Sequence, residues 1–210
     1  VQFIQYNGAG RSINMEHYYS KQQKSPLRIK KIRQKIKGIE FEFCTGSGVF
    51  SKEKIDKGTL ILAENMIVEG NSNVLDIGCG IGVLGIAAAK IFNANVIMSD
   101  INERAAMLAG KNIELNNVKA KIYHGNLYEK IKDTDFDVIL SNPPQTAGKE
   151  ICFKLIEQSK NYLKNGGSLQ LVARHNKGGK TLSEKMQEVF GNLDVTAKKS
   201  GYWVYRSFKE

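Results

Sequence analysis

The chain has 210 residues, of which 41% are apolar and 25% charged, so it can bury a sizeable core. This composition excludes wholesale disorder. The 31 Lys and Arg residues outnumber the 21 Asp and Glu residues, which gives a formal net charge of +10 and an isoelectric point near 9.4. A field of this sign attracts polyanions, so the composition favours a nucleic-acid partner without deciding the matter.

The three cysteines, Cys44, Cys79 and Cys152, are too few and too scattered for a disulfide framework, and they form no Cys-x-x-Cys pair. We therefore expect no metal and a reducing, cytoplasmic environment. No apolar run approaches the roughly 18 residues of a membrane span, and the N-terminus lacks a signal-peptide pattern. We expect no membrane partner, and the sequence does not indicate an oligomeric state.

Three segments are expected along the chain. Residues 1–14 have no clear periodicity and are interpreted as a leader or a remnant added for expression. Residues 15–56 form a basic N-terminal β elaboration, and residues 57–210 form the main domain. Within the elaboration, eight basic residues and no acid lie between positions 21 and 37.

The alternation of Ile39, Phe41 and Phe43 with two glutamates after this basic run predicts a half-buried strand, and Gly38 offers a hairpin turn before it. A basic hairpin is compatible both with a solvated face that caps the core and with direct RNA contact. The candidate RNA-binding residues here are Lys30, Lys31 and Arg33.

From residue 74 onward short apolar strands alternate with helical segments. The expected strands are residues 74–77, 96–98, 122–123, 138–140 and 169–173, and the expected helices are residues 82–92, 102–116, 148–163 and 180–190. Such alternation predicts an α/β fold with a parallel sheet covered by helices on both faces. Since ligands bind beyond the carboxyl ends of such strands, functional residues should directly follow each strand.

A glycine-rich turn follows the first of these strands and opens a helix, which predicts a cofactor site. It contains Gly78, Gly80 and Gly82. The spacing also satisfies a dinucleotide fingerprint, with Asp100 about 20 residues on, so a nicotinamide oxidoreductase is an alternative. Asp76 favours another ligand, because a carboxylate repels a pyrophosphate but suits the amino group and sulfonium of S-adenosyl-L-methionine.

Residues 74–82 resemble the first motif of class I, Rossmann-like methyltransferases, and Asp100 resembles their ribose-binding acid. The resemblance implies that a residue after the third strand contacts the adenine. Asn126 is the candidate because its side-chain amide can both donate and accept hydrogen bonds, and Leu127 lies beside it. The alternative is that Asn126 only forms a turn. Ile101 could pack on the adenine ring.

The fourth strand runs into Asn142, Pro143 and Pro144, which form a stiff loop whose carbonyls can point outward as acceptors. Bonds from an exocyclic amine to the Asn142 oxygen and the Pro143 carbonyl would orient its nitrogen for methyl transfer. The tetrapeptide resembles the Asn-Pro-Pro-aromatic motif of amino-group methyltransferases. Gln145 departs from it, so either another aromatic such as Phe50 or Tyr202 stacks on the base, or the target is held differently.

Several segments resemble the small-subunit ribosomal RNA guanine-N2 methyltransferases and their short archaeal relatives. They are residues 46–51, 56–62, 142–150 and 201–207. The resemblance implies a seven-stranded, mostly parallel sheet with the last strand antiparallel. In that family a degenerate copy precedes the catalytic domain; we expect no such copy here, so the basic hairpin would recognise the target. Lys177, in the basic loop after the fifth strand, is a further candidate for contact with an RNA phosphate. The alternative is that this loop is a solvated turn.

The sequence thus predicts methyl transfer from S-adenosyl-L-methionine to an exocyclic amine of an RNA base, in particular guanine N2 in ribosomal RNA. Residues 57–210 would be the catalytic domain. One alternative is methylation of a protein glutamine, whose planar amide would need the same hydrogen bonds to an Asn-Pro-Pro loop. Another is a non-catalytic RNA-binding protein with the same fold.

Overall fold

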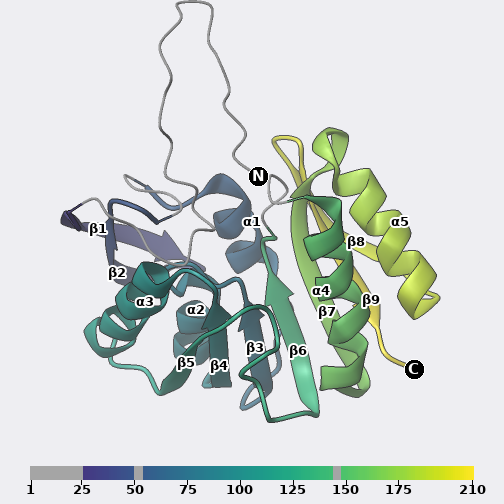
Figure 1. Cartoon of the computed structure of the whole chain (residues 1–210), viewed down its shortest axis with the longest axis horizontal. Helices are drawn as coiled ribbons and strands as arrows, with labels where there is room; N and C mark the ends of the chain where they lie inside the picture. Colours follow the sequence, from purple (N-terminus) through teal and green to yellow (C-terminus); the bar gives the residue numbers. More distant parts are fainter. Residues whose placement is uncertain (1–25, 50–53, 144–147) are drawn as a thin grey trace, which may run out of the picture.

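A computed structural model describes residues 26–49, 54–143 and 148–210, and its main feature is a seven-stranded sheet (Figure 1). The strand order is β5-β4-β3-β6-β7-β9-β8. The bounds are β3 Asn73–Ile77, β4 Asn95–Asp100, β5 Ala120–His124, β6 Phe136–Ser141, β7 Leu163–Arg174, β8 Asp194–Lys199 and β9 Tyr202–Phe208. The first five strands of this order run parallel, and β9 lies antiparallel between β7 and β8.

Helices cover both faces of the sheet, as the alternating pattern predicts. Their bounds are α1 Lys57–Asn65, α2 Val83–Phe92, α3 Glu103–Leu115, α4 Lys149–Tyr162 and α5 Gly179–Phe190, with a 3-10 turn η2 at His175–Lys177. One buried apolar cluster joins α1, α2 and α3 to the sheet, and a second joins α4 and α5 to it. None of the helices in the described part of the chain is long and apolar enough to cross a membrane.

An antiparallel hairpin, β1 Ile29–Ile36 and β2 Ile39–Gly46, turns at Lys37 and Gly38 and packs against α3. Its inner residues, Phe41 and Phe43, are 1% and 0% exposed, as the period-2 pattern predicts, whereas Ile39, beside the turn, is 36% exposed. The predicted hairpin and its turn are therefore confirmed, and the hairpin shares the core of the main sheet.

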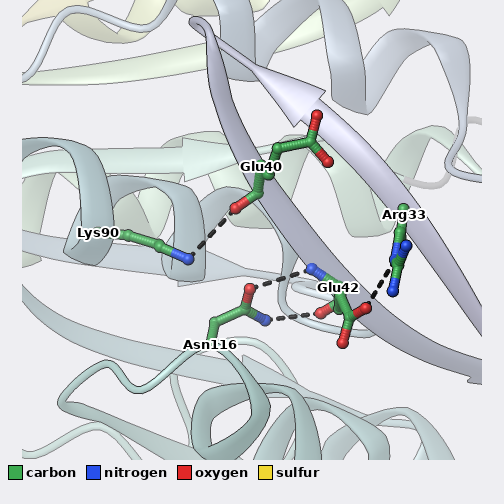
Figure 2. Close-up of polar contacts among 5 residues, drawn as sticks. All are labelled: Arg33, Glu40, Glu42, Lys90 and Asn116. Atoms are coloured by element: carbon green, nitrogen blue, oxygen red, sulfur yellow. Dashed lines mark hydrogen bonds and ion pairs between the residues drawn. The ribbon is translucent and has the colours of Figure 1, made fainter.

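Asn112 of α3 and Asn116, the C-cap of that helix, hydrogen-bond to the backbone of β2 in the way that a neighbouring strand would. Asn116 accepts from the amide of Glu42 at 3.2 Å and donates to its carbonyl at 2.7 Å (Figure 2). Asn112 does the same at Cys44, at 2.6 and 3.0 Å. Lys90 of α2 adds a bond to the carbonyl of Glu40 at 3.2 Å. The edge of β2 is thus satisfied by side chains, which fixes the hairpin on the domain.

Candidate active site

The carboxyl ends of four neighbouring strands lie side by side, and polar bonds join the loops that follow them. The Ser141 hydroxyl, at the end of β6, donates to the carbonyl of Ile77 at 2.8 Å. The amide of Gly78 donates to the carbonyl of Ser99 at 2.9 Å, and the Ser99 hydroxyl donates to the carbonyl of Leu127 at 2.8 Å. The loops after β6, β3, β4 and β5 therefore form one continuous edge, where a parallel sheet binds its ligands.

The glycine turn between β3 and α2 is left-handed at each of its three predicted glycines. The φ angles of Gly78, Gly80 and Gly82 are 69°, 57° and 87°, which a residue with a side chain adopts only with strain. Gly78 is exposed, and a Cβ built on it would meet nothing within 4 Å. The backbone of the turn therefore faces open space at the N-terminus of α2, and a ligand can approach it closely.

Asp76, the last but one residue of β3, is fully buried beneath this turn. Its Oδ2 accepts a hydrogen bond from the amide of Gly85 at 2.9 Å, whereas its buried Oδ1 has no partner among the described residues. Burial raises the pKa of Asp76 to about 7, and the nearby Asp100 carboxylate adds to this rise. The site therefore holds a carboxyl group that a cation would stabilise in its ionised form.

Asp100 ends β4 and organises two loops at once. One carboxylate oxygen accepts from the amide of Gly80 at 2.7 Å, and the other accepts from the amide of Asn102 at 2.8 Å. Asn102 is the N-cap of α3, and its side chain accepts from the amide of Ala105 at 3.2 Å. Asp100 therefore fixes the glycine turn and the start of α3 relative to each other.

The three residues predicted to contact an adenine lie at the same edge. Ile101 is half-buried, and its carbonyl lies 3.0 Å from a ring nitrogen of His124. Leu127 is half-buried with a positive φ of 49°. Asn126 beside it is exposed, and its backbone amide donates to the Glu129 carboxylate at 3.3 Å. The structure therefore places these residues at the same carboxyl edge of the sheet as the glycine turn, and their contact with an adenine remains a prediction.

On the other side of the glycine turn, Asn142 and Pro143 follow β6, which pairs directly with β3. Asn142 is half-buried, and its Nδ2 lies 2.9 Å from Asp56 Oδ2 and 2.9 Å from Thr59 Oγ1. Pro143 is buried. The sequence predicts no site role for Asp56 and Thr59, although both lie in residues 56–62, one of the segments that resemble the guanine-N2 methyltransferases.

The remaining candidates are the predicted RNA contacts. Lys30, Lys31 and Arg33 are exposed on β1, and the Arg33 guanidinium pairs with Glu42 at 2.7 Å (Figure 2). Lys177 is exposed in η2, directly after β7. Phe50, Pro144 and Gln145 lie outside the described residues. Within residues 26–49, 54–143 and 148–210 there is no group of three or more His, Cys, Asp or Glu that could hold a metal.

A sheet of this strand order, with a glycine turn after β3 and an acid at the end of β4, defines the class I methyltransferase fold. The solved T. thermophilus 16S rRNA N2 methyltransferase RsmC, in complex with AdoMet and guanosine, has a TM-score of 0.78 to this chain. It is 25% identical, and the match covers 89% of this chain and 52% of that one. The predicted fold is confirmed, including the antiparallel last strand.

The chain belongs to the Methyltransferase small domain family, whose model matches residues 40–206. Bacillus subtilis YbxB is 35% identical over 200 residues, which cover 92% of this chain and 98% of that protein. Ribosomal RNA small subunit methyltransferase C of Haemophilus influenzae is 32% identical over 163 residues, covering 75% and 48%. The chain therefore spans about half the length of the ribosomal RNA methyltransferases it matches and nearly all of YbxB.

Proposed function

We propose that this protein transfers a methyl group from S-adenosyl-L-methionine to the exocyclic N2 amine of a guanine in ribosomal RNA. The observation that supports the proposal most is the pairing of β3 with β6, which places the glycine turn and Asn142 on adjacent strand ends. A donor on one turn and an amine on the other would meet across the gap between two neighbouring strands.

The donor half of the edge fits S-adenosyl-L-methionine by its chemistry. The open space beside Gly78 admits a ligand against bare backbone, and the Asp76 Oδ1 atom lacks a partner among the described residues. Asp76 would offset the positive charge of the donor's amino-acid end, and Asp100 would accept hydrogen bonds from its ribose hydroxyls. When bound, the donor supplies an electrophilic methyl group on a sulfonium.

The acceptor half would orient the amine and favour its reaction. An exocyclic base nitrogen is a weak nucleophile because its lone pair is delocalised into the ring. Hydrogen bonds from its two N–H groups to Asn142 Oδ1 and to the Pro143 carbonyl would aim the nitrogen at the methyl group. The same acceptors stabilise the positive charge that develops on nitrogen during transfer. The chain need not remove a proton before the methyl group moves.

Two findings support RNA as the class of substrate. The net charge is +10, and the exposed face of β1 contributes Lys30 and Lys31 to it. The relatives named above include ribosomal RNA methyltransferases, and one of them was solved with guanosine. Guanine N2 is therefore the amine that we propose, with the basic hairpin holding the RNA backbone.

The experiment that tests the proposal offers several substrates in parallel. Purified protein is incubated with methyl-labelled donor and ribosomal subunits, transfer RNA or release factors, and the labelled product is digested to nucleosides or peptides. We expect label in small-subunit RNA, recovered as N2-methylguanosine, with an initial rate that is strongly reduced in the Asn142→Ala variant. Label in a protein glutamine alone, or in no substrate while RNA still binds, would contradict the proposal.

A further inference from the structure

The side-chain amide of Asn142 has a defined orientation that its own loop does not supply. Its Nδ2 lies 2.9 Å from a carboxylate oxygen of Asp56 and 2.9 Å from the hydroxyl oxygen of Thr59. A carboxylate oxygen only accepts hydrogen bonds, so the nitrogen end of the amide must face Asp56. The two acceptors match the two amide hydrogens, and Oδ1 is left at the opposite end of the group.

Both acceptors are held by the first turn of α1. Asp56 is the N-cap of this helix, and the Oδ2 atom that binds Asn142 also accepts from the amide of Thr59 at 3.1 Å. The amide of Leu60 donates to the carbonyl of Asp56 at 3.0 Å, which closes the first helical turn. Helix geometry therefore fixes the spacing of the carboxylate and the hydroxyl before any substrate binds.

Gly58 lets a third side chain pack against this turn. A Cβ at position 58 would lie 2.8 Å from the Tyr202 ring and 2.9 Å from Asp56 Oδ2, closer than real contacts allow. Tyr202, at the start of β9, is half-buried, and the Arg174 guanidinium lies over its ring at 5.2 Å. The ring and the carboxylate thus occupy the space that a side chain would need. This accounts for a glycine at position 58, between Asp56 and Thr59.

We propose that Asp56 and Thr59 are positioning residues, which hold the Asn142 amide with its oxygen presented to the amine of the substrate. The inference rests on the proposed function, because it gives a role to the same acceptor loop. An unheld amide can rotate by 180° and present Nδ2, a donor, to an amine that also donates. The two α1 side chains select the accepting rotamer in advance, which is the preorganisation that lowers a barrier.

The first test separates positioning from helix capping. Asp56→Ser retains an N-cap oxygen but is too short to reach Asn142, and Thr59→Val removes the hydroxyl at nearly constant shape. Each is expected to lower kcat about 10- to 100-fold while the Kd for the donor stays within about twofold. Asp56→Asn and Thr59→Ser keep an accepting oxygen and should restore most of the rate.

A matched control comes from the other end of α1. Asn65 donates to the carbonyl of Ile61 at 2.8 Å, so Asn65→Ala changes α1 away from the Asn142 amide. Its kcat should stay unchanged, and the Tm of Asn65→Ala and of Thr59→Val is measured alongside. Equal kcat losses in the two variants at equal Tm would show that α1 acts only through stability, and would overturn the inference.

The second test needs no RNA and so separates this inference from the proposed function. In the ¹H–¹⁵N NMR spectrum the side-chain amide signals of Asn142 are those lost in Asn142→Ala. Thr59→Val and Asp56→Ser should shift these signals and speed their exchange with water, whereas Asn65→Ala should not. Unchanged signals would refute the positioning role even in an active enzyme. Altered signals in a protein that never methylates RNA would support the role and refute the RNA function.

Discussion

The donor edge of the sheet, formed by Asp76, the glycine turn and Asp100, differs from the basic hairpin in how far its polar side chains are exposed to water. At the donor edge the polar side chains are buried and bonded to backbone: Asp100 is 3% exposed, Asn102 1% and Asp76 0%. On the hairpin the charged residues of β1 face water, and the one ion pair drawn in Figure 2, Arg33 with Glu42, is largely exposed. Buried polar bonds are few and costly to break, whereas exposed charges act together and are screened by salt.

Substitution of Asn142 should have the largest effect on kcat, because in the proposed site no other side chain accepts a hydrogen bond from the amine. Asn142→Ala is expected to lower kcat about 10²- to 10³-fold, by loss of one preorganised acceptor. Donor affinity, measured by calorimetry, should change less than about twofold. A variant that loses donor binding and kcat together would show instead that the loop after β6 supports the glycine turn.

Substitutions at the contact between the hairpin and the donor edge should lower the free energy of unfolding the most. Asn112 is fully buried and bonds to both backbone groups of Cys44 and to the carbonyl of Ile81 at 2.9 Å, so it ties the hairpin to the glycine turn. Asn112→Ala leaves three buried polar groups without this partner and should cost about 2–4 kcal/mol of unfolding free energy. Asn116→Ala, nearer the solvent, should cost less.

Urea unfolding followed by circular dichroism measures both values, and Lys111→Ala, exposed on the same helix, is the control that should leave stability nearly unchanged. If Asn112→Ala behaved like Lys111→Ala, the hairpin would be held by apolar packing alone.

The buried acid predicts a pH dependence that the exposed hairpin charges do not. The pKa of Asp76 is raised from its ordinary 3.8 to about 7, so between these values the folded protein binds the proton more tightly than the unfolded chain. Stability from this group is therefore present at low pH and is lost as pH rises towards 7. Asp76→Asn keeps an acceptor for Gly85 without the charge.

Relative to wild type, the Asp76→Asn variant should gain about 2–3 kcal/mol between pH 5 and pH 8, measured by urea unfolding without donor. Parallel stability curves for the two proteins would mean that Asp76 stays ionised throughout and that the donor edge tolerates its charge.

The hairpin should give the smallest effect for each residue. Lys30→Gln and Lys31→Gln are each expected to weaken RNA binding a few-fold and to reduce the slope of log K against log salt by about 0.7–0.9. Arg33→Gln should do less, since Glu42 already pairs with that guanidinium. Fluorescence anisotropy over a salt series measures this, with Lys132→Gln, exposed before β6, as the control. Equal losses for Lys132→Gln would indicate binding by net charge alone.

The two regions also differ in how far the sequence predicts them. Strands β3 to β7 and the glycine turn were predicted, because short apolar runs mark buried strands and glycines mark left-handed turns. Strands β8 and β9 were not among the strands expected from the apolar pattern. The predicted strand 169–173 is shorter than β7 Leu163–Arg174, since this strand begins with polar residues and two glycines that no apolar pattern marks. Helix α1 was not predicted, because its nine residues are too few for a clear period.

The contacts that complete the site could not be read from the sequence at all. Asn142 meets Asp56 across 86 positions, and Asn116 meets Glu42 across 74. Such pairs depend on which elements the fold packs together, and neither amide differs in type from a surface residue. The glycine turn and Asn142 were predicted as separate motifs, and their adjacency follows from the strand order.

A co-crystal structure with S-adenosyl-L-homocysteine and guanosine tests the central claim most directly. We expect the amino group of the ligand near Asp76, its ribose hydroxyls on Asp100, and its sulfur directed at an amine held by Asn142 Oδ1. A ligand sulfur turned away from Asn142, or a nucleoside bound at the other edge of the sheet, would contradict it.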